Sequence, residues 1–497
     1  MANVRSVLRP LLYALFTLPF LTLYLQAQSA PDITLSSETQ ECLGCHESLH
    51  PGIVADWRSS RHSNMTPAIG RAKPELERRI SASSVPASLD GVAVGCYECH
   101  SLNGASHRDN FEHFGYRINL VVSPNDCALC HSLEAEQYGQ GKKAHAIDNL
   151  DKNPVYALLV ETVISAKSVQ DGMISHTKPS ETTRNKTCFA CHGSVVDVIG
   201  KKTLATDLGD IDVPLLSNWP NQGVGRRNPD GSYGACTACH PRHSFSIEVA
   251  RDPHTCSQCH LQPDLPAWDV YIESKHGNIF LAKSSSYDLD AVPWKVGKDF
   301  RAPSCATCHN SLLVSPDGEM IAERSHNFSA RLWWRIFGLV YAHPQPTSGA
   351  THTLKNKDGL PMPTAFTGEF ATSGLLSTDE MSARRTTMER VCRSCHGTTW
   401  ATGFLDQLDT TVAETNAMTL EATKLLDKAW KAGLVDPANP FDEALEQQWI
   451  AHWLFYATSV RYGAAMAGPD YSTFKYGWWD LTTNLTKMRD AVEGKKK

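Results

Sequence analysis

The chain has 497 residues, of which 41% are hydrophobic and 8% aromatic, and its formal net charge is −6. These contents are low for a single large core built from side chains alone, and the weakly acidic balance excludes a typical nucleic-acid partner. All 16 cysteines fall in CxxCH units, so none is left for a disulfide or a free thiol.

Residues 1–30 have the layout of a secretory signal peptide. Arg5 and Arg9 precede an apolar run over 11–25, and small residues follow it. The run is shorter than the ~20 residues that span a bilayer, and Pro19 interrupts it. We therefore expect cleavage rather than a retained anchor, export to the periplasm or the extracellular space, and no membrane span in the mature chain.

Eight CxxCH units, named boxes one to eight in chain order, lie between residues 42 and 396. In such a unit the two thiols form thioethers with a haem, and the adjacent histidine becomes the proximal ligand of the iron. Paired CxxC zinc sites do not need a histidine behind every pair. We predict eight covalently attached haem c groups, whose porphyrins supply the apolar bulk that the composition lacks. The boxes are Cys42/Cys45/His46, Cys96/Cys99/His100, Cys127/Cys130/His131, Cys188/Cys191/His192, Cys236/Cys239/His240, Cys256/Cys259/His260, Cys305/Cys308/His309 and Cys392/Cys395/His396.

Box one also matches the metalloprotease pattern HExxH, from His46 to His50. We reject that interpretation because His46 is already assigned to a haem, and because Pro51 would end a zinc-binding helix at once. His50 is then a surface residue or a local haem contact.

A second histidine makes a haem iron an electron carrier, whereas an iron with an open position can bind a substrate. The boxes use eight of the 21 histidines. The 13 that remain are enough for every iron, so the count alone leaves a vacant iron undecided. We expect sixth ligands among His62, His107, His113, His145, His243, His276 and His326, with His107 and His113 as alternatives between boxes two and three.

The rest of the chain is expected to be mainly α-helical, with a core built around haems. An amphipathic helix is predicted at 156–168, and His326 is predicted to begin a helix whose Trp333 and Trp334 face a porphyrin. Loops rich in Gly, Pro and Asn are expected between boxes four and five, with a turn at 228–231.

The character of the chain changes after box eight. Apolar residues at three- and four-residue spacing predict helices at 405–433, 441–464 and 474–492, none of which contains cysteine. We expect a helical bundle that packs on the haem core and on neighbouring subunits. The predicted division is 1–30 signal peptide, 31–400 octahaem cytochrome c domain and 401–497 helical region.

Three stretches resemble the octahaem hydroxylamine oxidoreductase family: VVSPNDCALCH at 121–131, the run at 219–276, and GPDYSTFKYGWWDL at 468–481. The likeness extends from about residue 40 to the C-terminus. It implies a mainly helical subunit that forms homotrimers, in which seven haems with two histidines each serve one catalytic haem. It also implies a small nitrogen compound as substrate and a cytochrome or quinol-linked protein as redox partner. The catalytic haem of the family is the fourth, here Cys188/Cys191/His192.

Two features depart from the oxidative members of that family. Those members carry CHxxPDH after box six, but this chain reads CHLQPDL, so Asp264 is present and Leu265 replaces a proton-transferring histidine. Oxidative members also cross-link a tyrosine from a neighbouring subunit to the catalytic porphyrin. Tyr462 is the nearest candidate, but Met466 stands where a histidine is expected.

These departures favour reduction of nitrite or hydroxylamine to ammonia. Hydroxylamine or hydrazine oxidation, or a non-catalytic electron conduit, are the alternatives. Around box four we expect His192 and Asp264 at the catalytic site, together with Tyr341 and His343 from the loop after box seven.

Overall fold

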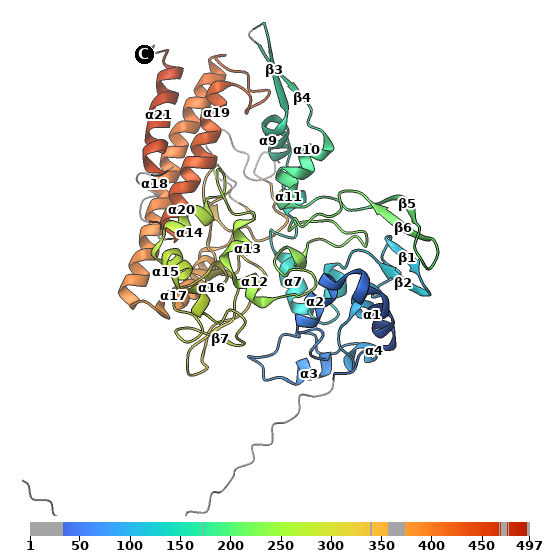
Figure 1. Ribbon diagram of the computed structural model, residues 1–497. Coiled ribbons are helices and arrows are strands. Elements are labelled where there is room, and N and C mark those ends of the chain that lie inside the picture. Colours follow the sequence, from blue (N-terminus) through green and yellow to red (C-terminus); the bar gives the residue numbers. More distant parts are fainter. Residues whose placement is uncertain are drawn as a thin grey trace, which may run out of the picture.

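The computed structural model describes residues 33–171, 173–337, 340–355, 373–466, 468, 475 and 477–494. The predicted signal segment therefore lies outside the described residues. The chain is mainly α-helical, as predicted. Figure 1 shows a bundle of long helices beside a region of short helices, loops and hairpins. Within the described ranges, no helix has the length and apolar character that a membrane crossing requires.

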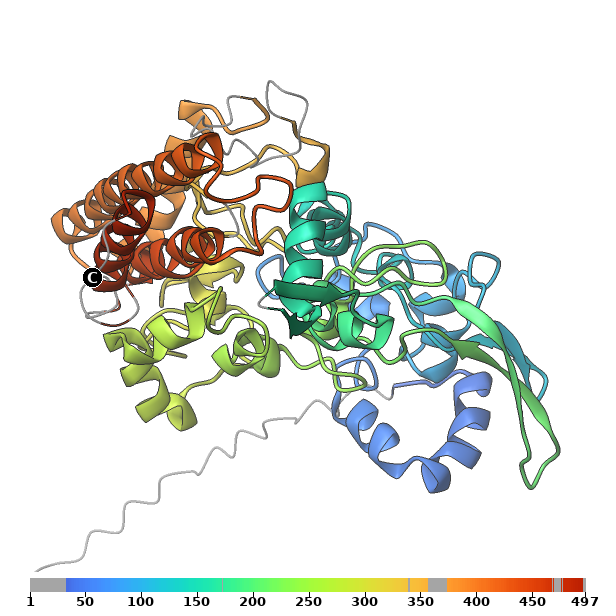
Figure 2. The same cartoon turned by 90° about the horizontal axis from the view of Figure 1, so that it is seen from above.

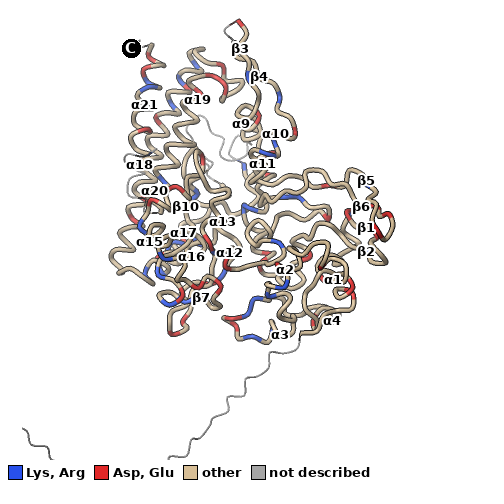
Figure 3. The backbone as a smooth tube through the Cα atoms, in the orientation of Figure 1, with Lys and Arg blue, Asp and Glu red and all other residues tan. Residues whose placement is uncertain are grey.

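The helices before residue 310 are short because several boxes form helical turns of their own. Boxes two, four and seven coincide with α5, α11 and α16, and loops connect these turns. The helices are α1 (Ser37–Leu49), α2 (Pro51–Ser59), α3 (Pro67–Ala72), α4 (Ala87–Asp90), α5 (Cys96–His100), α6 (Pro124–Cys127), α7 (Ser132–Gln140), α8 (Ala146–Asp151), α9 (Pro154–Ile164), α10 (Glu181–Lys186), α11 (Cys188–His192), α12 (Ile247–Arg251), α13 (Pro253–Ser257), α14 (Ala267–Glu273), α15 (Lys275–Lys283) and α16 (Cys305–His309). Positive and negative side chains are interspersed along the backbone (Figure 3).

Strands are few and form small antiparallel hairpins, apart from a three-stranded sheet of β7, β8 and β9. The hairpin β3–β4 projects from the body in Figure 1. The hairpin β5–β6 projects as well and lies beside β1–β2 (Figure 2). The strands are β1 (Asn110–His113), β2 (Tyr116–Asn119), β3 (Ala166–Gln170), β4 (Met173–Thr177), β5 (Val198–Leu204), β6 (Ile211–Leu216), β7 (Trp294–Lys295), β8 (Leu313–Val314), β9 (Met320–Ala322), β10 (Trp334–Arg335) and β11 (His343–Pro344).

The segment between boxes four and five is more regular than predicted. The loops expected there include the hairpin β5–β6, which the scattered Gly and Pro residues obscured in the sequence. The predicted turn at 228–231 is confirmed, because the amide of Gly231 donates to the carbonyl of Asn228 over 2.9 Å.

Two helix predictions need correction. The helix expected at 156–168 ends at Ile164, since the following residues leave it to pair as β3 with β4. The helix expected from His326 does not form. Instead the buried Arg331 side chain donates to the carbonyls of Thr307 (3.1 Å) and Ser311 (2.6 Å), which holds this segment as an irregular loop against box seven.

The helices predicted after box eight are confirmed. They are preceded by α17 (Thr378–Arg393), and the long helix α18 (Thr398–Lys431) packs against the others. The second predicted helix contains a π-helical turn, η4. Trp449, Leu426 and Met488 are almost fully buried between these helices. The remaining elements are α19 (Ala444–Ile450), η4 (Ala451–Tyr456), α20 (Ala457–Met466) and α21 (Trp478–Val492).

A close approach between two loops fixes the end of box four. Gly193 directly follows the box and has φ +95, a conformation that suits glycine. A Cβ atom on Gly193 would lie 2.3 Å from the amide nitrogen of Arg226, and one on Gly223 would lie 2.2 Å from the amide nitrogen of Gly193. Neither position has room for a side chain.

We expect Gly193→Ala to destabilise the haem-loaded protein by about 1–3 kcal/mol, because it adds both a clash and a strained φ. Gly397→Ala is the matched control: Gly397 also follows a box histidine, but a Cβ there meets no atom within 4 Å. Thermal unfolding followed by circular dichroism, with haem content measured in parallel, tests the difference. Equal midpoints for the two variants would contradict the proposed role of the glycine contact.

Candidate haem sites and the pocket at box four

One connected cavity of about 2460 Å³ is bordered by residues of both the short-helix region and the bundle. Pockets for single small ligands are typically about 300–1,000 Å³. All eight box histidines and 15 of the 16 box cysteines line this cavity. A large shared space bordered by thiol pairs and imidazoles fits covalently bound porphyrins.

The box histidines are oriented as metal ligands require. Nδ1 of His100 lies 2.7 Å from the carbonyl oxygen of Asn119, and Nδ1 of His192 lies 3.4 Å from that of Ala146. An Nδ1–H group that donates to a carbonyl fixes the ring and leaves Nε2 free to bind iron.

Three box histidines face a second imidazole across the cavity. The ring centres are 6.0 Å apart for His46 and His113, 6.2 Å for His131 and His62, and 5.9 Å for His396 and His276. Two imidazoles on opposite sides of one metal ion, each bound at about 2 Å, have ring centres about 6 Å apart. The three separations therefore fit pairs of axial ligands.

Two more predicted sixth ligands line the cavity near a box histidine. Burial and the nearby imidazole of His100 lower the pKa of His243, while burial and the imidazole of His240 lower the pKa of His326 to about 4. A neutral imidazole is the form that binds a metal. The structure thus brings His243 to box two and His326 to box five.

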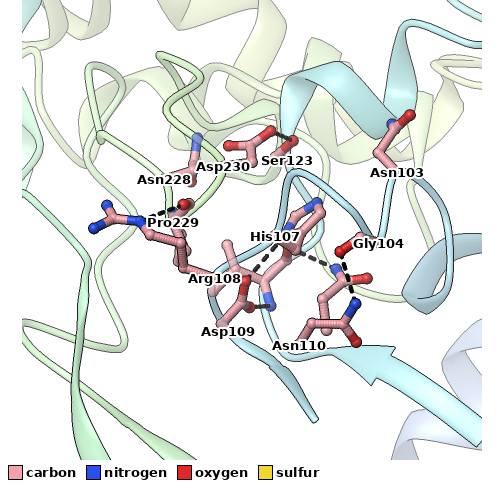
Figure 4. Close-up of polar contacts among 12 residues, drawn as sticks. Asn103, Gly104, His107, Arg108, Asp109, Asn110, Ser123, Asn228, Pro229 and Asp230 are labelled. Atoms are coloured by element: carbon pink, nitrogen blue, oxygen red, sulfur yellow. Dashed lines mark hydrogen bonds and ion pairs between the residues drawn. The ribbon is translucent and has the colours of Figure 1, made fainter.

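His107 is held in a different way. Its Nδ1 lies 3.0 Å from Asp109 (Figure 4). Its Nε2 lies 3.2 Å from both carboxylate oxygens of Asp126. The three side chains are buried, and both ring nitrogens of His107 are engaged. Of the two alternatives between boxes two and three, the structure brings His113, rather than His107, to the cavity.

His145 and His50 also have local partners. Nε2 of His145 lies 2.8 Å from the carbonyl oxygen of Gly139, and the cavity lining includes the nearby Lys143 instead. Nδ1 of His50 lies 2.9 Å from Nδ1 of His46, so His50 is a neighbour of the proximal ligand of box one.

Neighbouring boxes touch through their thiols. The pairs in hydrogen-bonding contact are Cys42 with Cys96, Cys127 with Cys236, Cys191 with Cys259, and Cys256 with Cys305. Each contact joins two different boxes, so porphyrins attached there would have adjacent edges. The contacts form three groups, namely boxes one and two, boxes three and five, and boxes four, six and seven.

The part of the cavity at box four has an apolar wall and a polar wall. Val160 and Ile164 of α9 pack with Phe189 and Cys188 of the box. On the polar wall, Asp264 interacts with His192 and with Tyr462 of α20. Tyr462 reaches this wall within its own chain, whereas the resemblance implied a tyrosine from a neighbouring subunit.

A half-buried cation completes the polar wall. Arg335 of β10 lines the cavity and interacts with the hydroxyl groups of Tyr156 and Tyr462. Within the described part of the chain, its guanidinium group forms no ion pair. The sequence analysis missed Arg335, although a lone cation in the apolar run LWWRIF was a usable signal.

Burial shifts the pKa values of the ionisable side chains in this wall. It raises the pKa of Asp264 and of Tyr462, and it lowers the pKa of Arg335. The pKa of Lys142, which interacts with Arg335, is also lowered by burial. Asp264 therefore holds a proton more readily than an ordinary carboxyl group.

The predicted catalytic residues divide into two groups. His192 and Asp264 line the cavity, whereas Tyr341 and His343 are not among its lining residues. His343 lies opposite Arg335 in the β10–β11 pair, and burial together with Arg335 lowers the pKa of His343 to about 3. Tyr341 packs in the core of the bundle.

The fold and the boxes together define a multihaem c-type cytochrome. Family models agree: residues 230–340 and 364–439 match the model described as seven times multi-haem cytochrome CxxCH, and 126–208 match cytochrome c554 and c-prime. A solved structure described as a hypothetical multiheme protein is 45% identical, with a TM-score of 0.86, over 92% of this chain and 96% of that one.

Within this class, the chain is similar to hydroxylamine oxidoreductase (HAO)-like multihaem cytochromes. It is 23% identical over 429 residues to a probable nitrite reductase-hydroxylamine oxidoreductase fusion protein of Kuenenia stuttgartiensis. That match covers 83% of this chain but only 40% of the relative. The fold is shared with the Kuenenia stuttgartiensis reducing HAO-like protein complex Kustc0457/Kustc0458, at 20% identity and a TM-score of 0.60 over 92% of this chain and 85% of that one.

The His107 cluster predicts a pH-dependent contribution to stability. Burial lowers the pKa of His107, but the two carboxylates outweigh this and raise it to about 10. A raised folded-state pKa stabilises the fold fully below the ordinary value near 6.5, and the effect is lost as the pH rises towards 10. We expect His107→Gln to lower the free energy of unfolding by on the order of 2–4 kcal/mol at pH 6 and much less at pH 10.

Chemical denaturation at a series of pH values measures this difference. His254→Gln is the matched control, because His254 also lies 2.8 Å from an aspartate, Asp252, but the pair is exposed and should contribute little at any pH. A His107→Gln effect that is constant from pH 6 to pH 10 would show that the charge of His107 does not stabilise the fold.

Proposed function

We propose that the chain binds eight haem c groups, one at each box, and reduces nitrite or hydroxylamine to ammonia at box four. Five irons would have two histidines each. These pairs are His46 with His113, His100 with His243, His131 with His62, His240 with His326, and His396 with His276.

His192 would hold the box-four haem on one side, and no second imidazole of the described residues faces it. A haem c at this position would supply an iron that can bind a nitrogen atom and exchange electrons. The remaining work falls to the residues of the polar wall.

The single observation that carries the proposal is the unpaired cation at this wall. Arg335 lines the cavity beside Tyr156 and Tyr462, without an ion pair in the described part of the chain. A half-buried guanidinium group without a carboxylate partner favours a small anion, and its planar donors suit the two oxygens of nitrite. Binding of hydroxylamine, which is neutral, would depend less on the guanidinium group.

Proton supply is the second requirement, because reduction to ammonia consumes protons as well as electrons. Asp264 borders the same space, and burial raises its pKa, so it holds a proton more readily than an ordinary carboxyl group and can pass one to the substrate. Tyr462 interacts with Asp264 and can donate a hydrogen bond to a bound oxygen. Leu265 contributes no proton-transfer group.

Electron supply follows from the thiol contacts. Box four touches box six through Cys191 and Cys259, and box six touches box seven through Cys256 and Cys305. Adjacent porphyrin edges would allow several electrons to arrive in succession. The reducing HAO-like complex agrees with this direction, whereas the fusion relative is named for both a nitrite reductase and a hydroxylamine oxidoreductase.

An electron conduit is the second candidate, and one observation favours it. Cys45 of box one and Cys395 of box eight are exposed, so haems attached at these two boxes could exchange electrons with other proteins. The conduit hypothesis requires every iron to be low-spin and six-coordinate. A high-spin, five-coordinate signal in electron paramagnetic resonance spectra would exclude it.

Hydroxylamine or hydrazine oxidation is the third candidate. It would require a covalent bond between Tyr462 and the box-four porphyrin, which mass spectrometry of the haem peptide would detect. We further propose export to the periplasm or the extracellular space, a homotrimer, and a cytochrome or quinol-linked protein as redox partner. Trp479, at 66% exposure, is available for subunit packing.

The direct test supplies the purified, haem-loaded protein with reduced viologen and nitrite or hydroxylamine. We expect ammonium in both reactions. Ammonium no higher than with the denatured protein would contradict the reductive function.

The role of Arg335 gives a sharper prediction. Arg335→Gln should lower kcat/KM for nitrite by about 10–100-fold, the equivalent of one lost charge-assisted hydrogen-bonded contact of about 1.5–3 kcal/mol. Hydroxylamine, which is mostly neutral at pH 7, is the internal control and should lose less than about threefold. An equal loss for both substrates would mean that Arg335 supports the haem site rather than the anion.

A further inference from the structure

Three boxes lack a second imidazole, although the resemblance implies only one open iron. All 21 histidines lie within the described residues. Five non-box histidines face boxes one, two, three, five and eight, as described above. The other eight non-box histidines have local partners, so boxes four, six and seven remain without a facing histidine. These eight are His50, His107, His145, His176, His254, His343, His352 and His452.

A lysine lies near box six. Lys143 lines the cavity, and within the described part of the chain its ammonium group forms no hydrogen bond or ion pair. Its charge adds to the burial that lowers the pKa of His260 to about 3. The same charge favours the thiolate forms of both box-six cysteines, Cys256 and Cys259. The ammonium group therefore lies close to all three attachment residues of that box.

The number of interacting groups assigns Lys143 to box six rather than to box five or box seven. Lys143 interacts with both thiols and the histidine of box six, but only with Cys239 of box five and His309 of box seven. Phe328 holds the lysine in place, since Nζ lies 3.9 Å from the centre of its ring. The carbonyl of Phe328 in turn accepts a hydrogen bond from His309.

The neighbouring Lys142 cannot serve in this role. Its ammonium group donates to Ser329 over 2.6 Å and to the side chain of Gln345. Lys142 therefore forms hydrogen bonds with hydroxyl and amide oxygens, whereas the ammonium group of Lys143 contacts only an aromatic ring.

We propose that Lys143, as a neutral amine opposite His260, is the sixth ligand of the box-six iron. Binding a metal requires the amine to lose its proton, and the proton leaves to solvent when the haem is incorporated. Ligation would make box six an electron carrier rather than a second substrate site. Because box six touches box four through Cys259 and Cys191, it would be the first carrier next to the candidate catalytic site.

The test uses the haem-loaded full chain and spectroscopy rather than turnover. Lys143→Arg keeps the positive charge and the contact with Phe328, but a guanidinium group does not lose its proton and cannot bind iron. We expect Lys143→Arg and Lys143→Ala each to convert one low-spin iron per chain to high-spin in electron paramagnetic resonance spectra. Lys143→His should restore a low-spin iron with an all-histidine signature in near-infrared magnetic circular dichroism.

Lys142→Arg is the matched control and should leave the wild-type spectrum unchanged. Mass spectrometry of each variant establishes that every haem is attached. A wild-type low-spin pattern in fully loaded Lys143→Arg would overturn the proposal and leave the lysine a purely electrostatic role. If Lys143→Ala loses a haem, full loading of Lys143→His with the all-histidine signal still supports ligation, and a Lys143→His spectrum identical to wild type contradicts it.

Discussion

The attachment of each porphyrin to a CxxCH box is the constraint on which the rest of the structure depends. The side chains leave a connected space of about 2460 Å³ that they do not fill themselves. A space this large is stable only when other apolar groups occupy it, because protein interiors are normally close-packed. The short helices, the loops between them and the modest aromatic content follow from this arrangement, since each box needs only one helical turn and a loop to present its thiols and imidazole.

The features predicted most reliably were those that depend on the spacing of residues close together in the sequence. The boxes, the mainly helical fold and the helices after box eight follow from short motifs and from three- and four-residue periodicity. The hairpin β5–β6 and the loop after His326 were missed because tertiary contacts decide them. Arg331 reaches the carbonyls of Thr307 and Ser311, and no local pattern around Arg331 indicates that it will do so.

The choice among histidines depended on partners that are distant in sequence. His107 and His113 looked equivalent, but Asp126, nineteen positions from His107, engages its second ring nitrogen. His145 was expected as a ligand, yet it bonds to Gly139 while Lys143 enters the cavity. A histidine is available to a metal only if nothing else binds its nitrogens, and that condition is a property of the folded chain.

The region after residue 400 contributes side chains to the candidate site at box four. The polar wall at box four takes Tyr156 from α9, Asp264 from the segment after box six, Arg335 from β10 and Tyr462 from α20. These positions span about 300 residues of sequence, so the wall exists only when the bundle is docked on the haem region. The π-helical turn η4 also brings Leu454 and Phe455 to the cavity, in line with the frequent occurrence of such turns at functional sites. The bundle is therefore part of the candidate site, and changes in its docking should alter chemistry at box four before they alter the outer boxes.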